Sequence, residues 1–139
     1  MPKSEKQKLK LLYLLKILTE QTDEQHPMAM PVLLEKLKAE DISAERKSIY
    51  NDINCLVDFG VDVGFDPSRS SGGYYLASRD FELPELKLLV DAVSASRFIT
   101  KSKSKQLIGK IEKLTSRHEA VQLQRQVYTS EQIKNENES

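Results

Sequence analysis

The chain contains few of the residues from which metal sites, disulfide frameworks and aromatic grooves are built. Its 139 residues include two histidines, one cysteine and no tryptophan, and aromatic residues make up 6%. The single cysteine, Cys55, excludes an internal disulfide and is typical of a protein in the reducing cytoplasm. So few aromatic residues argue against a groove that stacks the bases of a single strand. We therefore expect a cytoplasmic protein without disulfides.

Groups of residues with the spacing of a metal site or an active site are missing as well. His26 and His118 are isolated, and neither has a cysteine, a histidine or a carboxylate at metal-ligand spacing. Residues 72–73 are Gly-Gly but lack the Lys-Ser/Thr that completes a phosphate loop. No Ser–His–Asp set, no Cys–His set and no convincing pair of carboxylates stands out. The sequence therefore predicts no metal ion, no cofactor and no enzymatic activity.

Long apolar runs are also lacking. No run approaches the roughly 18 residues that a bilayer-spanning helix needs. The apolar stretch 9–18 is interrupted by Lys10 and Lys16. The basic start of the chain is not followed by a small-residue cleavage site, so we expect no signal peptide and no membrane partner.

Charge is abundant but balanced. The chain has 21 basic and 21 acidic residues, with 39% apolar and 30% charged residues, as in an ordinary globular protein. A net charge of zero counts mildly against a nucleic-acid partner, because such domains are often basic. Basic residues nevertheless gather in residues 1–10 and 101–117, whereas acidic residues gather in 20–24, 35–45 and the tail. The local distribution therefore leaves room for a nucleic-acid partner.

The spacing of apolar residues predicts a mostly α protein with one small β-hairpin. Helical periodicity is present in residues 4–21, 31–40, 43–59, 83–99 and 104–115, and more weakly in 119–128. About three residues, 41–43, separate the second helix from the third, as in a helix-turn-helix. Residues 61–65 and 74–76 are expected to be strands, joined by the turn-rich loop 66–73. This order predicts a winged helix-turn-helix over residues 1–78, a helical extension over 79–128, and a polar linker or tail over 129–139.

The helix expected over residues 43–59 has two distinct faces. Ser43 is a candidate N-cap, and Gly60 is a candidate stop because glycine enters the left-handed conformation cheaply. Ile49, Ile53 and Leu56 form an apolar stripe that predicts a core face. The opposite face carries Lys47, Asn51 and Asn54 and is flanked by Arg46 and Tyr50.

That opposite face has the chemistry that reads base edges in the major groove. Asn bonds adenine through two hydrogen bonds, and Arg or Lys bonds guanine. Arg69, in the loop of the hairpin, would lie against a phosphate or in a minor groove. The residues that we expect at the DNA are Ser43, Arg46, Lys47, Ser48, Tyr50, Asn51, Asn54 and Arg69.

Some of these residues have a simpler interpretation. Tyr50 could contact a phosphate or a thymine methyl group, or could only cover the edge of the helix. Cys55 is expected to be a small, half-buried hydrophobic residue rather than a redox switch. The lysines of residues 101–105 are expected to form a solvated face, with phosphate contact as the minority interpretation.

The motifs resemble those of a known family. Residues 42–53, ISAERKSIYNDI, resemble the amino-terminal winged helix of bacterial WYL-domain transcriptional regulators, which is similar to that of the DeoR group. Residues 81–100, together with the run KSKSK at 101–105, are similar to the helical connector of that family, and the resemblance covers about residues 8–125. The family usually has Arg-Asp where this chain has Asn51-Asp52, so its base preference is not carried over. Its β-rich, ligand-sensing domain is absent from the chain, so an effector ligand is expected only if such a domain exists.

The resemblance and the residues together predict a sequence-specific regulator of transcription, or the DNA-reading part of one. Two copies paired about a two-fold axis would place their recognition helices about 34 Å apart on double-stranded DNA. The alternative is a winged-helix module for protein–protein interaction that does not bind DNA, because a fold does not determine a function.

Overall fold

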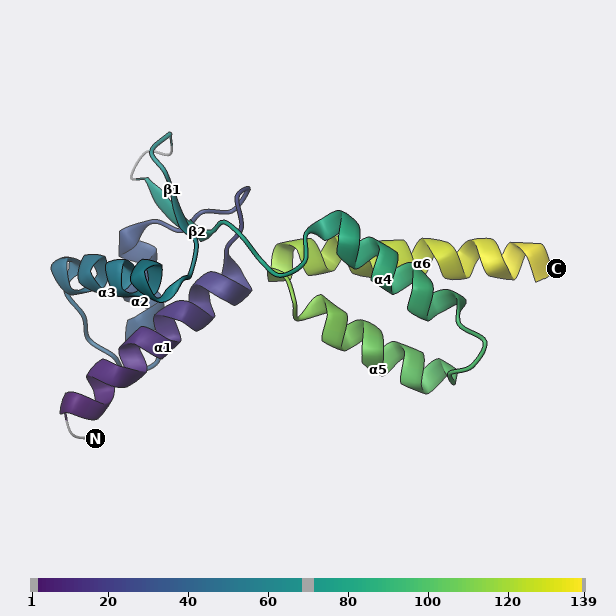
Figure 1. The fold of residues 1–139 in the computed structure, drawn as a ribbon, viewed down its shortest axis with the longest axis horizontal. Helices are drawn as coiled ribbons and strands as arrows, with labels where there is room; N and C mark the ends of the chain where they lie inside the picture. The colour runs from purple at the N-terminus through teal and green to yellow at the C-terminus, as the bar shows by residue number, and fades with distance from the viewer. Residues whose placement is uncertain (1–2, 69–71, 139) are drawn as a thin grey trace. The chain divides into compact units, whose positions relative to one another are not determined.

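A computed structural model describes residues 3–68 and 72–138 of the chain, and the side chains of residues 6–68 and 72–127. The described part is mostly helical and has one two-stranded antiparallel sheet (Figure 1). Its elements are α1 (Lys3–Gln21), α2 (Met30–Ala39), α3 (Arg46–Phe59), β1 (Val63–Asp66), β2 (Gly73–Leu76), α4 (Leu83–Ala95), α5 (Lys101–Glu112) and α6 (Arg117–Glu138). The chain divides into two compact units, residues 1–78 and 79–139, each with its own hydrophobic core.

The first unit packs α1, α2 and α3 around one core. Its fully buried apolar side chains are Leu14, Leu18, Leu33, Leu37 and Ile49. Burial of each such side chain is worth about 1.5–3 kcal/mol, so this cluster accounts for the helix packing. The apolar stripe predicted for α3 is confirmed, because Ile49, Ile53 and Leu56 are all buried.

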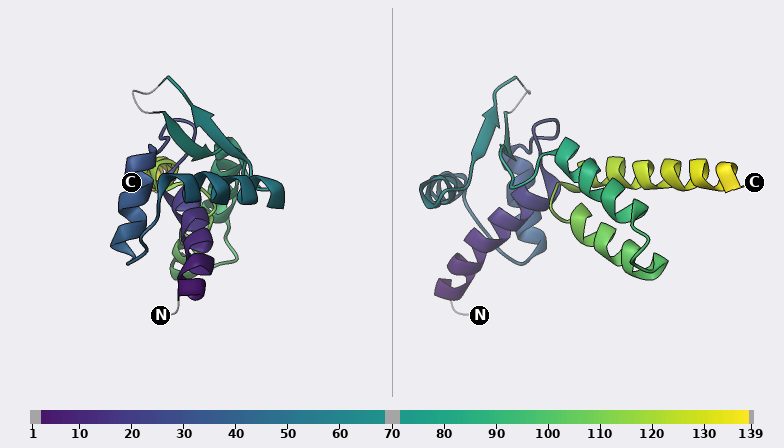
Figure 2. Two further views of the ribbon diagram at one scale, coloured as in Figure 1. Left: turned by 90° about the vertical axis from the view of Figure 1, so that its left-hand side faces the viewer. Right: turned by 45° about the vertical axis from the view of Figure 1, so that its right-hand side comes forward.

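The β-hairpin rises from one side of the three helices (Figure 2). Its register pairs Val63 with Leu76 and Phe65 with Tyr74. The segment between α1 and α2 holds it in place, because Met28 and Tyr74 exchange two backbone N–H···O hydrogen bonds of 2.8 Å. The orientation of the hairpin is therefore set by residues far away in the sequence.

The connection between α2 and α3 is longer than the three residues predicted. It runs from residue 40 to residue 45, and α3 begins at Arg46 with Glu45 at the N-cap and no side-chain cap. The prediction that Ser43 is the N-cap was therefore wrong. The reason is tertiary: the side chain of Ile42 enters the core, and the chain must stay extended until it reaches α3.

Both α2 and α3 end in the same hydrogen-bond pattern. After α3, Gly60 has φ 114° and the N–H of Val61 donates to Leu56, as the sequence predicted for a glycine stop. After α2, Asp41 takes the left-handed position with φ 60° and the N–H of Ile42 donates to Leu37. An aspartate tolerates this conformation better than most residues do.

The second unit is a group of three helices (Figure 1). Its buried cluster consists of Leu86, Val90, Ile108 and Leu123, which come from α4, α5 and α6. Residues 129–138, which were expected to be a polar linker or tail, are helical, because α6 continues to Glu138.

Two boundaries in the second unit also differ from the prediction. Helix α4 ends at Ala95 rather than at residue 99. The next helix begins at Lys101, because the Thr100 hydroxyl accepts a hydrogen bond of 3.1 Å from the N–H of Lys103 and caps it. The run at residues 101–105 thus forms the first turns of α5, with its lysines exposed.

Candidate nucleic-acid interface

The side of α3 opposite its buried stripe is open to solvent. Lys47, Asn51 and Asn54 are all exposed on it, and Arg46 and Tyr50 are exposed at its edge. A helix with an exposed, donor-rich face and a fixed rear face has the form that a major groove accepts. The structure therefore brings five of the eight predicted DNA-binding residues together on the exposed side of one helix.

The charge on this helix is uneven along its length. Arg46 and Lys47 lie in its first turn, whereas Asp58 lies exposed in its last turn. The positive end is therefore the amino-terminal end, which is the end that contacts bases in helix-turn-helix proteins.

A buried lysine holds the rear of α3 against α1. The side chain of Lys10 is only 2% exposed, and its Nζ lies 3.0 Å from Oδ2 of Asp52. The same ammonium group donates a hydrogen bond to the Ser48 hydroxyl. Oδ2 of Asp52 has no hydrogen bond of good geometry to the described residues, so the contact is an ion pair. The pair sets the rotation of α3 about its own axis.

This arrangement changes the interpretation of Ser48. We expected the residue at the DNA, but its side chain is half-buried and its hydroxyl is bonded to Lys10. It therefore belongs to the contact that orients α3 rather than to the exposed face.

An aromatic cluster joins α3 to the hairpin. The rings of Tyr50 and Tyr74 meet edge to face with centroids 6.4 Å apart, and the ring of Phe65 lies 4.9 Å from that of Tyr74. Burial raises the pKa of the Tyr74 phenol above its usual 10.0, and Tyr50 raises it further through charge repulsion and a side-chain hydrogen bond. The ring contact therefore joins the edge of α3 to the hairpin.

The remaining predicted residues lie elsewhere. Ser43 is exposed in the segment before α3. Arg69 falls outside the described residues. Cys55, expected to be half-buried, is exposed on α3.

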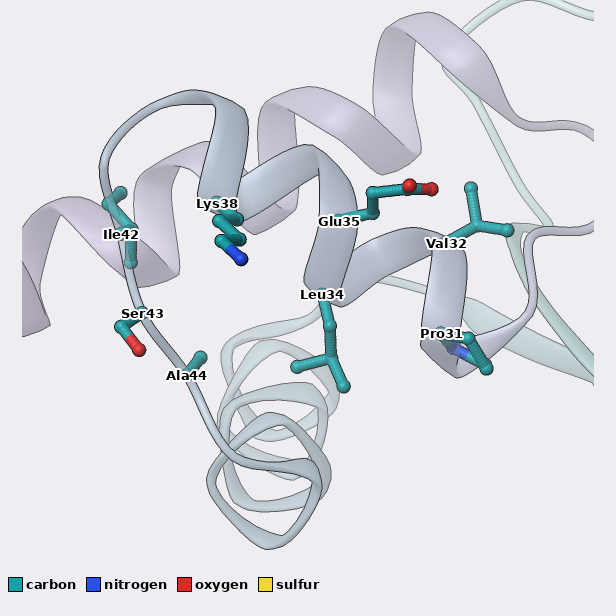
Figure 3. Close-up of a pocket in the computed structure, with 8 residues that line it drawn as sticks. All are labelled: Pro31, Val32, Leu34, Glu35, Lys38, Ile42, Ser43 and Ala44. Atoms are coloured by element: carbon teal, nitrogen blue, oxygen red, sulfur yellow. The ribbon is translucent and has the colours of Figure 1, made fainter.

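Ser43 lines a shallow hollow of about 400 Å³ between α2 and the segment that precedes α3 (Figure 3). Leu34 and Ala44 point into it from opposite sides, and Lys38 and Ser43 stand at its rim. The hollow is open and of mixed polarity, and it lies beside α3 rather than on its exposed face.

Sequence reasoning missed two residues that orient the interface, Lys10 and Tyr74. Lys10 interrupts a leucine-rich stretch, which was the only signal that it could be buried. Tyr74 had no signal, because its partners Met28 and Tyr50 are remote in the sequence.

Comparison of the chain with known protein families, curated proteins and solved structures finds no match. Across residues 3–68 and 72–138, no helix is long and apolar enough to cross a membrane. The same described residues contain no group of three or more histidine, cysteine or acidic side chains that could hold a metal ion.

Proposed function

We propose that the chain is the DNA-reading part of a transcriptional regulator and that residues 1–78 act as a winged helix-turn-helix. Helix α3 enters the major groove, and the hairpin 61–76 lies on the flanking backbone as the wing. The observation that carries this proposal is the exposed face with Lys47, Asn51 and Asn54 on a helix whose rear face is fixed by its buried stripe and by Lys10. This face offers the donors and acceptors that match base edges.

We also propose that two copies bind together on a pseudo-palindromic site. One α3 covers too few base pairs to give high specificity, and a two-fold pair reads the same half-site twice, about one helical turn apart. Such a pair could form on the DNA itself, with little association of the free chains.

A protein-interaction module is the second candidate. The hollow lined by Pro31, Val32 and Leu34 favours it, as do Val57 and Phe59, which are exposed near the end of α3. Hollows with apolar lining residues and exposed apolar side chains are typical of surfaces that bind a peptide. The zero net charge of the chain points the same way.

Salt dependence of duplex binding tests the first proposal against the second. Affinity for a pool of duplex DNA is measured by fluorescence anisotropy between about 50 and 200 mM salt. Three to five neutralised phosphates would give a log–log slope of roughly −3 to −5, because each contact releases condensed counterions. The variant Lys47→Ala, which removes an exposed lysine of α3, should weaken binding. The variant Lys105→Ala removes an exposed lysine of α5 and is its matched control. Absence of binding at low salt would exclude DNA as the partner.

A further inference from the structure

We propose that Tyr50 donates a hydrogen bond to one backbone phosphate of the duplex and that Tyr74 of the hairpin is the residue that positions it. The inference rests on the proposed DNA-reading function and deepens it. It adds a residue of β2 to the interface and assigns a different task to each tyrosine.

The first argument is the place of Tyr50 on the helix. It lies on the edge of α3 that faces the hairpin, as its contact with Tyr74 requires. If α3 occupies the major groove and the hairpin reaches the flanking minor groove, the backbone of one strand runs between the two. Tyr50 stands at that boundary, where the nearest groups of the DNA are phosphates and sugars.

The second argument is the chemistry of the hydroxyl group. A phenol has one proton to donate and can also accept. The ring of Tyr50 contacts that of Tyr74 edge to face, and Tyr50 is 42% exposed. Its hydroxyl can therefore donate its proton to a group outside the protein. A phosphate oxygen is a strong acceptor of such a hydrogen bond.

The third argument is the rigidity of Tyr74, the residue that contacts Tyr50. The backbone of Tyr74 is fixed by its two hydrogen bonds to Met28 and by its pairing with Phe65. Its ring contacts those of Phe65 and Tyr50. Tyr74 therefore holds the Tyr50 ring in one orientation before DNA arrives, so that less side-chain freedom is lost on binding.

The test uses the full chain with Tyr50→Phe, Tyr74→Phe and the double variant. The matched control is Tyr75→Phe, which removes a hydroxyl from the next residue of β2, on the opposite face of the hairpin. The probes are a duplex selected by the wild-type protein from random sequence and an unrelated duplex of equal length at low salt. Thermal unfolding of each variant checks that it is folded.

We expect Tyr50→Phe to weaken binding to both duplexes by about tenfold, because a hydrogen bond to a charged group is lost. The salt slope should stay unchanged, because a neutral hydroxyl releases no counterion. Tyr74→Phe should weaken binding less and should add nothing in the Tyr50→Phe background. Replacing phosphates one at a time by neutral methylphosphonate should reveal one position that weakens the wild type but not Tyr50→Phe.

Four results would overturn the proposal. Equal affinity of Tyr50→Phe and the wild type would remove Tyr50 from the phosphate. A loss confined to the selected duplex and reproduced by exchanging a thymine for deoxyuridine would assign Tyr50 to a thymine methyl group instead. An equal loss from Tyr74→Phe in both backgrounds would make its role purely structural. If the wild type binds neither duplex, both this inference and the proposed function fail, whereas the other three results leave the proposed function intact.

Discussion

At the scale of single residues, the ion pair between Lys10 and Asp52 explains which side of α3 faces the solvent. The pair is 3.0 Å long and joins two helices that are remote in the sequence, with Lys10 almost fully buried. Burying a charge is costly unless it is paired, so α3 has one favoured rotation, in which Asp52 meets Lys10.

We predict that Lys10→Met destabilises the first unit by about 3 kcal/mol, because it leaves the Asp52 carboxylate half-buried without a cation. Urea denaturation followed by circular dichroism measures the change. The double variant Lys10→Met/Asp52→Asn should recover part of the loss. Lys8→Met, an exposed position on the same helix, is the control and should change stability by less than about 0.5 kcal/mol. Equal effects at both lysines would mean that the buried pair has no special role.

We also predict that Lys47→Ala and Asn51→Ala each lower the affinity for a selected duplex by about 1–3 kcal/mol and relax the base preference nearby. Both side chains are exposed, so neither change should alter folding. Selection of duplexes from a random pool by each variant gives the preference directly. If both variants select the same sequence as the wild type, α3 is not the recognition helix.

At the scale of elements, two glycines illustrate how the same substitution acts at a helix end and inside a helix. Gly60 ends α3 with φ 114°, whereas Gly109 lies inside α5. A Cβ atom added at either position would meet no other atom within 4 Å. Only the backbone conformation therefore distinguishes the two sites.

We predict that Gly60→Ala destabilises the chain by about 1–2 kcal/mol, because alanine is strained in the left-handed region. Gly109→Ala should instead stabilise it by about 0.5–1 kcal/mol, because alanine is the better helix former. Denaturation midpoints of the two variants check both signs. A shift of the same sign in both variants would contradict the assigned end of α3 or the assigned course of α5.

At the scale of the whole molecule, the two units differ in the size of their cores. Eleven residues make up the buried apolar cluster of the first unit, and four make up that of the second, among residues whose side chains are described. Helix α6 covers α4 and α5, because Leu123 is fully buried in the same cluster as Leu86 and Val90.

This covering leaves little apolar surface of the second unit for self-association. Leu88 (70% exposed) and Phe98 (99% exposed) remain open, but Leu88 faces away from the core of α4 and Phe98 lies beyond the end of that helix. Such isolated residues remove little apolar area on pairing, whereas association costs about 4–15 kcal/mol. We therefore predict at most a weak dimer of the free chain and a clear two-to-one complex on a palindromic duplex.

Sedimentation equilibrium at high micromolar concentration, with and without the duplex, measures both states. The variant Leu88→Ser/Phe98→Ser serves as the control and should leave the complex intact. A tight dimer in the absence of DNA that this variant abolishes would show that the second unit drives pairing.

The sequence by itself determined the elements and the two faces of α3, because both depend on residues three and four positions apart. The apolar stripe of Ile49, Ile53 and Leu56 and the stop at Gly60 could be predicted in this way. So could the hairpin, from alternation and turn residues. The same reasoning underestimated α6, whose apolar pattern is weak on its own and which gains stability by packing on α4 and α5.

Only the tertiary structure decided which polar side chains are buried. It also decided which residues fix the orientation of the exposed side chains of α3. From the sequence alone, Lys10 is indistinguishable from a surface lysine. In the structure it is buried and paired with Asp52 of a remote helix. Tyr74 gains its role only when the hairpin lies against α3 and Met28. The start of α3 moved from Ser43 to Arg46 because the core draws in Ile42. In each case the deciding contact joins segments that are separate in the sequence, and no local periodicity encodes such a contact.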